Sequence, residues 1–119
     1  MTLNIWDNIS AESIDNYSEV WNYEATCDCI IIIDASTNYG STKPSGIKIL
    51  TNSRLYDKKN NQDYSTIAIS ESSQNYLDIR AYASLIINKG AIIKIEQKVL
   101  NLGKMIGTVR YVTIPCNVN

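Results

Sequence analysis

Apolar residues recur at every second position along most of the chain after residue 20, and this period constrains the fold more than any other feature. In residues 91–99 (AIIKIEQKV), Ile93 and Ile95 share one side of the segment, while Lys94 and Glu96 share the other. Successive side chains of a β-strand point to opposite faces, so the pattern predicts a strand with one buried and one wet face.

Other segments repeat this alternation and are separated by turn-forming residues. Residues 76–86 place Arg80 and Tyr82 on their wet face, and Gly90 in the following Asn-Lys-Gly can adopt the positive φ of a hairpin or a tight corner. The further strand candidates are residues 30–33, 46–50, 64–70 and 105–114. Seven or eight short strands with regular turn signals predict an all-β fold, an antiparallel β-sandwich of the jelly-roll kind.

The N-terminal segment departs from this pattern. We expect residues 1–22 to form an arm and residues 23–119 to form the sandwich. Ser10 can cap a short helix or turn over residues 10–21, because apolar residues recur there at helical spacing. The arm carries large apolar side chains with no obvious core to join, so we predict that they bury against a partner subunit. These interface candidates are Ile5, Trp6, Ile9, Ile14 and Trp21.

Length and charge limit the partners that the chain can have. Its 119 residues suit one domain, and 11 basic residues against 12 acidic ones leave no basic stripe for nucleic acid. Residues 1–17 lack the charged and apolar regions of a secretory signal, and no apolar run is long enough for a membrane span. We therefore expect a protein made in the cytoplasm, without membrane insertion and with reduced thiols.

The stretch TCDCIIIID, residues 26–34, resembles an enzyme motif at first sight. A structural zinc site needs four ligands, whereas the chain has no histidine and Cys116 is the only thiol besides Cys27 and Cys29. Redox activity is disfavoured as well, because Cys-x-Cys lacks the helix N-terminus that activates Cys-x-x-Cys pairs. We interpret the cysteines as buried structural thiols, without deciding whether any of them pair. The following run Ile30–Ile33 predicts a strand covered on both faces.

Catalytic constellations are otherwise sparse, and we expect a protein that is not an enzyme and needs no cofactor or metal. The absence of histidine excludes Ser-His-Asp and Cys-His arrangements, and no glycine-rich phosphate loop is present. Carboxylate pairs for glycoside hydrolysis could only come from residues in or beside polar loops, where an exposed charge is the default. These carboxylates are Asp34, Asp63, Glu71 and Asp78.

Tyrosine and asparagine are the loop residues best suited to recognition. A tyrosine ring can stack on a sugar or on a partner protein, and an amide can bridge hydroxyl groups. At each position the alternative is a tyrosine that covers the edge of the core. The ligand-binding candidates are Asn38, Tyr39, Tyr64, Asn75 and Tyr76.

The order of three segments resembles the small jelly-roll tip modules of bacteriophage fibres and capsid appendages, which share motifs with tumour-necrosis-factor-like sandwiches. The segments are YEATCDCIIIIDAS, GIKILTNSRLY and ASLIINKGAIIKIEQ. The likeness covers residues 23–115, and its best match is Ile87 to Ile95. Cys29 stands where that family has glycine, Ala91 replaces an aspartate, and residues 49–52 only approximate the central motif.

The resemblance implies a virion protein without enzymatic activity. It would assemble as a homotrimer, or attach to capsid or fibre sites through its N-terminal arm, as a capsid decoration, a head fibre or a tail-fibre component. Its partners would be itself and other virion proteins, and it could display a receptor-binding surface for a host glycan. The alternative function is a lectin-like carbohydrate-binding module that uses the tyrosine and asparagine loops, for which several weak sites would add avidity.

Overall fold

The computed structural model describes residues 2–10, 16–39, 45–57, 63–72, 79–99 and 103–116, of which 2–10, 37–39, 45, 72, 99 and 103–106 are described by their backbone alone. These residues contain eight strands and no helix. The strands are β1 (Thr2–Ser10), β2 (Ser18–Glu24), β3 (Cys29–Tyr39), β4 (Ser45–Thr51), β5 (Ser65–Ser72), β6 (Arg80–Ile87), β7 (Ile92–Val99) and β8 (Gly103–Pro115). Among the described residues, no helix has the length and hydropathy of a membrane span.

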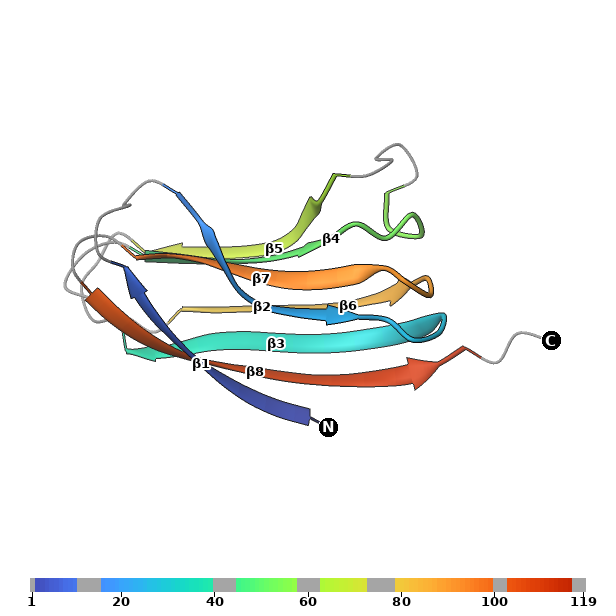
Figure 1. Ribbon diagram of the computed structural model, residues 1–119, viewed down its shortest axis with the longest axis horizontal. Coiled ribbons are helices and arrows are strands. Elements are labelled where there is room, and N and C mark those ends of the chain that lie inside the picture. The colour runs from blue at the N-terminus through green and yellow to red at the C-terminus, as the bar shows by residue number, and fades with distance from the viewer. Residues whose placement is uncertain are drawn as a thin grey trace.

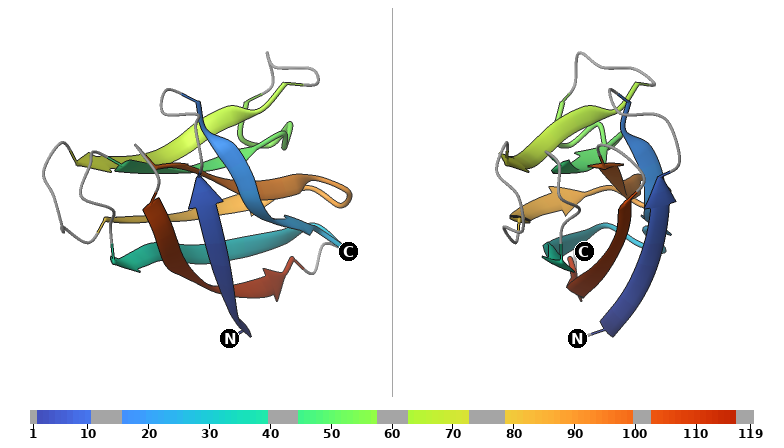
Figure 2. Two further views of the ribbon diagram at one scale, coloured as in Figure 1. Left: turned by 60° about the vertical axis from the view of Figure 1, so that its left-hand side comes forward. Right: turned by 90° about the vertical axis from the view of Figure 1, so that its left-hand side faces the viewer.

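The strands form two four-stranded antiparallel sheets, which confirms the predicted sandwich. One sheet has the order β1-β8-β3-β6 and the other β2-β7-β4-β5. Apart from β4 and β5, strands that follow one another in the chain lie in opposite sheets, as in a jelly roll. Figure 1 shows most strands of the two sheets running along the long axis of the molecule, and the right-hand view of Figure 2 shows the strands from one end.

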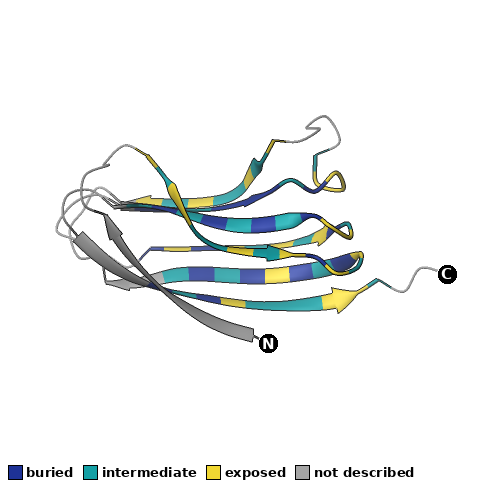
Figure 3. Cartoon of the chain, viewed as in Figure 1, coloured by how far each residue is buried: buried dark blue, intermediate teal, exposed yellow. Residues whose placement is uncertain are grey.

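The core lies between the two sheets and is built largely of isoleucine. Ile31 and Ile33 of β3 and Ile93 and Ile95 of β7 are completely buried, whereas the residues between them are partly or largely exposed. Figure 3 shows this banding along β3. The inward faces agree with those predicted from the period of two, because β-branched side chains pack well on a pleated surface.

The turn between β6 and β7 joins the two sheets. Gly90 has φ of 85°, as its place in the sequence predicted, but β6 pairs with β3 while β7 pairs with β2 and β4. The turn is therefore the tight corner rather than the hairpin. The Asn88 side-chain carbonyl fixes it to the neighbouring connection, accepting hydrogen bonds from Ser53 Oγ at 2.8 Å and from the Arg54 backbone N–H.

The N-terminal segment supplies one strand to each sheet. β1 pairs with β8 along its whole length, and β2 pairs with β7, with a register shift between Glu19 and Trp21. The helix considered for residues 10–21 is replaced by strand at residues 18–21, because pairing with β7 satisfies that backbone. Residues 11–15 lie outside the described part. Whether residues 1–22 act as an arm separate from the sandwich stays a prediction.

Tyr17 crosses the outer face of the β2-β7-β4-β5 sheet. Its hydroxyl donates a 2.5 Å hydrogen bond to Glu71 of β5, and the ammonium groups of Lys48 and Lys98 lie over its ring, at 4.2 and 5.1 Å from the ring centroid. Burial, and then this hydrogen bond, raise the pKa of Tyr17, while the pKa of Glu71 is lowered. Gly46 lies under the ring, so close that a β-carbon there would meet the tyrosine hydroxyl.

Replacing Gly46 by alanine should therefore destabilise the domain. The added methyl group must displace the Tyr17 ring, which breaks the hydrogen bond to Glu71, so we expect a loss of about 1–2 kcal/mol in the free energy of unfolding. Urea denaturation measures it. In a Tyr17→Ala background the same glycine substitution should cost much less, and equal costs in both backgrounds would contradict the explanation.

Candidate functional site

The outer face of the β1-β8-β3-β6 sheet is apolar over part of its extent, and no strand of the described residues forms a second layer over it. The continuous run Ile30–Ile33 predicted a strand covered on both faces, and for the single chain this prediction is wrong. Ile31 and Ile33 are fully buried, but Ile32 is 43% exposed and Ile30 only partly buried. The reason is architectural, since the other sheet covers only the inner face of β3.

The exposed apolar side chains come from three neighbouring strands in register. Ile30 of β3 lies opposite Ile86 of β6 on one side and opposite Ile114 of β8 on the other. The next row joins Ile32 to Val112. Side chains that face each other across paired strands lie side by side on one face, so these residues form one continuous surface. We call this set, Ile30, Ile32, Ile86, Val112 and Ile114, the apolar half of the outer face.

The remaining rows of the same face are polar. Asp34 of β3 lies opposite Tyr82 of β6 and Arg110 of β8, and its carboxylate accepts two hydrogen bonds from Arg80, from Nε at 2.9 Å and from Nη2 at 2.6 Å. These bonds, and the charge of Asp34, raise the pKa of Arg80, so the guanidinium stays cationic. The two-point geometry fixes both side chains relative to the sheet.

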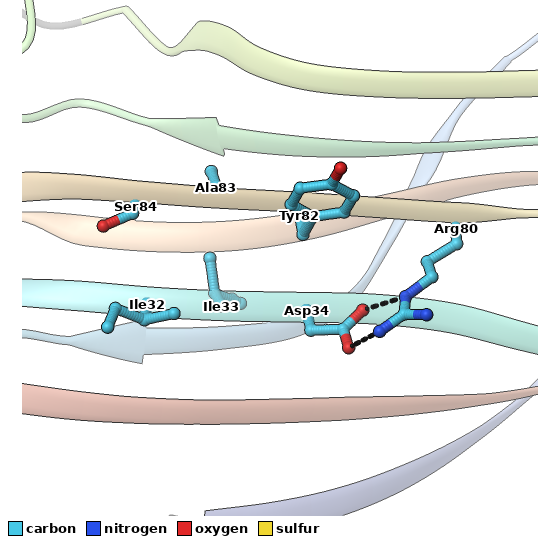
Figure 4. A pocket seen from close by; sticks show the side chains of 7 residues that line it. All are labelled: Ile32, Ile33, Asp34, Arg80, Tyr82, Ala83 and Ser84. Carbon is cyan, nitrogen blue, oxygen red and sulfur yellow. Dashed lines mark hydrogen bonds and ion pairs between the residues drawn. The ribbon is translucent and has the colours of Figure 1, made fainter.

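A shallow hollow of about 660 Å³ lies where the apolar and polar rows meet (Figure 4). Tyr82 stands at its edge with 73% of its surface exposed, more than any other large apolar side chain in the described part of the chain. The Asp34–Arg80 pair closes one end, and Ser84 lies toward the other. The residues that line it are Ile32, Ile33, Asp34, Arg80, Tyr82, Ala83 and Ser84.

The outer face of the other sheet has a different character. It carries Lys48 of β4 and, at every second position of β7, Lys94, Glu96 and Lys98. Lys94 forms an ion pair with Glu96 at 3.1 Å. Ile69 is the one large apolar side chain of that sheet that is more than one-third exposed in the region the structure describes. The two outer faces are therefore unequal: the β2-β7-β4-β5 sheet has a mainly charged outer surface, whereas half of the outer face of the β1-β8-β3-β6 sheet is apolar.

The predicted ligand residues are not brought together by the described part of the structure. Tyr64 precedes β5, and the Lys94 ammonium group lies over its ring at 4.0 Å. Asn38 and Tyr39 belong to the end of β3, where only the backbone is described, and Asn75 and Tyr76 lie outside the described residues. A role for these residues in ligand binding stays a prediction.

The predicted interface residues are placed only in part. Trp21 packs within the chain, with its ring 5.3 Å from that of Tyr111 and 6.5 Å from that of Tyr23. In β1, the backbone of Ile5, Trp6 and Ile9 pairs with that of Thr108, Gly107 and Lys104 in β8, and Ile14 lies outside the described residues. Contact of this set with a partner stays a prediction.

The cysteines lie near the start of β3 and the end of β8. Cys29 is buried, as the interpretation of structural thiols required, and burial raises the pKa of its thiol, which disfavours a reactive thiolate. Cys27 and Cys116 are partly exposed. Within the described ranges, no three histidine, cysteine, aspartate or glutamate side chains are grouped to hold a metal ion.

The candidate carboxylates are also placed in part. Asp34 is bound by Arg80, and Glu71 accepts hydrogen bonds from Tyr17 and Lys98. Asp63 is exposed, and Asp78 lies outside the described residues.

Sequence reasoning did not identify the apolar half of the outer face. Period-two analysis assigned Arg80 and Tyr82 to a wet face, which is correct for a single chain, since both are exposed. The available signal was the unbroken isoleucine run of β3, which indicates apolar surface on both sides of a strand. The partners of that strand in β6 and β8 could not be identified without the sheet order.

Comparison with known proteins shows the fold and nothing finer. No protein-family model and no curated protein matches the sequence. Two crystal structures of murine APRIL, at pH 8.5 and pH 8.0, align with TM-scores of 0.56 and 0.57 at 14% and 12% identity, covering 92% of this chain and 99% of theirs. Eiger TNF from S. frugiperda aligns with a TM-score of 0.41 at 9% identity, over 85% of this chain and 69% of its own. The chain therefore has a tumour-necrosis-factor-like jelly-roll fold.

Proposed function

We propose that this chain is a non-enzymatic assembly protein that forms a homotrimer through the outer face of its β1-β8-β3-β6 sheet. The observation that carries the proposal is the uncovered apolar half of that face. Ile86 and Ile114 lie on either side of Ile30 and are 51% and 47% exposed, and Ile32, in the next row of β3, is 43% exposed. Contiguous apolar surface of this kind is typical of protein interfaces rather than of surface that faces water.

In a closed ring of copies, the apolar surface of every copy is covered by a neighbouring copy. Copies that meet through two different parts of one face must close on themselves or grow into a fibre. Three copies around an axis bury the isoleucines at the centre, while Arg80 and Arg110 lie toward the polar side of the face. The number three is supported by the resemblance of residues 23–115 to trimeric phage modules.

We further propose that the trimer is an appendage of a bacteriophage virion, either a decoration or head fibre on the capsid or a component of a tail-fibre tip. The support is the resemblance in sequence, with Lys89 and Gly90 in register at the corner between β6 and β7. β1 fits such a role because it is the edge strand of the assembling sheet, next to β8. An edge strand offers backbone groups with which a neighbouring virion protein can pair.

Mass in solution tests the assembly. Sedimentation equilibrium over a hundredfold range of concentration should give a species of about 40 kDa, three times the 13.3 kDa of one chain. The apolar interface should also make the mass insensitive to salt, since screening weakens charged contacts only. A single species at the mass of one chain would contradict the proposal, and so would a dimer.

A further inference from the structure

We propose that the hollow beside Tyr82 binds a saccharide, specifically a pyranose ring that presents two neighbouring hydroxyl groups. This inference goes beyond assembly, since the hollow lies on the polar side of the face and shares only Ile32 with the apolar half. It also differs from the lectin reading of the sequence, because none of its lining residues belongs to the tyrosine and asparagine set predicted from the loops.

Tyr82 supplies the platform on which a sugar ring can lie. It is 73% exposed on an edge strand, so little of the ring contributes to the core of this chain. The C–H groups on one side of a pyranose pack against an aromatic face, while the tyrosine hydroxyl remains free to hydrogen-bond. Figure 4 shows the Tyr82 ring on β6 and, next to it on the neighbouring strand β3, the carboxylate of Asp34.

The Asp34–Arg80 pair supplies a fixed set of acceptors and donors beside this platform. Each carboxylate oxygen accepts one bond from Arg80 and keeps a further lone pair, and the guanidinium keeps N–H groups that point away from Asp34. A vicinal pair of hydroxyls can donate to the carboxylate and accept from the guanidinium together. Because the pair is already ordered, binding a sugar there loses little side-chain entropy.

The other outward-facing lining residues match the amphipathic character of a sugar. Ile32 offers apolar contact, and the exposed Ser84 offers a hydroxyl beyond it. A ligand that lacked hydroxyl groups would leave Asp34 and Arg80 facing an apolar surface, which is costly. A purely ionic ligand would find the cation and the anion of the site already neutralising each other. A neutral sugar ring can contact the apolar lining through its C–H groups and the Asp34–Arg80 pair through its hydroxyl groups.

A glycan microarray followed by calorimetric titration tests the inference. We expect the wild-type chain to bind a set of glycans that share one terminal monosaccharide, whose methyl glycoside is then titrated. Tyr82→Ala should weaken this binding about tenfold or more, and Asp34→Asn by a similar factor. Tyr82→Phe should bind within about threefold of wild type, because it keeps the ring. Tyr56→Ala removes a tyrosine that is 46% exposed elsewhere and should change nothing.

Each result bears on the inference separately from the trimer. A trimer that binds no glycan, or that binds equally well after Tyr82→Ala, overturns the inference and leaves assembly intact. A monomer that binds glycan through Tyr82 supports the inference and overturns the trimer. If Tyr82→Ala also disrupts the trimer, the methyl glycoside is titrated against Ile86→Asp, which keeps the lining of the hollow. Retained single-site affinity supports the inference, and its loss overturns it.

Discussion

Replacing Ile93 by aspartate should leave the chain unfolded at room temperature. Ile93 lies on β7, inside its sheet between β2 and β4, and its side chain has no exposed surface. Its partners across the sheet are Tyr23 and Thr51, and neither carries a positive charge. An unpaired carboxylate in a packed interior costs several kcal/mol. The loss of apolar packing adds to that cost, and a domain of this size has only about 5–15 kcal/mol of stability.

Far-ultraviolet circular dichroism and urea denaturation check this expectation. The matched control is Ile69→Asp, the same substitution on an isoleucine that is 52% exposed on β5. It should retain the β-sheet spectrum and unfold within about 0.5 kcal/mol of wild type. A folded Ile93→Asp chain with an unchanged urea midpoint would show that the assignment of this face to the core is wrong.

Replacing Ile86 by aspartate should give a folded monomer. Ile86 is 51% exposed on the edge strand β6, so a charge there remains hydrated in the single chain and costs little stability. In the proposed trimer the same charge enters an interface formed by Ile30 and Ile114, where it has no partner. Truncating or charging a residue at the centre of an interface commonly costs 2 kcal/mol or more, roughly thirtyfold in affinity.

Sedimentation velocity on Ile86→Asp and on the Ile69→Asp control measures this effect. The two isoleucines are almost equally exposed and lie on the edge strands of opposite sheets, so they differ mainly in the face they occupy. We expect Ile69→Asp to remain trimeric. If both variants keep the mass of the wild type, the outer face of β6 is not the assembly surface. If both variants become monomeric, the added charge explains the loss of the trimer, whichever outer face it lies on.

Part of this fold was readable from the chain because strand formation depends on local pattern. The alternation in residues 91–99 predicted the buried side of β7, and the place of Gly90 predicted its positive φ. The interpretation of a buried thiol held for Cys29. Each of these features depends on the local backbone or on whether a side chain faces the core. The pattern of neighbouring residues is therefore enough to predict it.

The candidate site was not readable in this way. Nothing local distinguishes a corner from a hairpin at Gly90, yet the corner places β6 next to β3 instead of β7. That pairing brings Ile86 beside Ile30, and Tyr82 and Arg80 beside Asp34. Likewise, nothing local in residues 1–22 indicated that β1 pairs with β8 and β2 with β7.

The sequence by itself determined that the segments of β3 to β8 are strands and, for β6 and β7, which side faces a dry interior, because a period of two is set by the backbone of each strand. Only the tertiary structure decided which strands are neighbours. Strand order depends on long connections, whose closure entropy changes little with the residues in them. The apolar outer face and the hollow are both products of that order, since each is assembled from strands that are far apart in the chain.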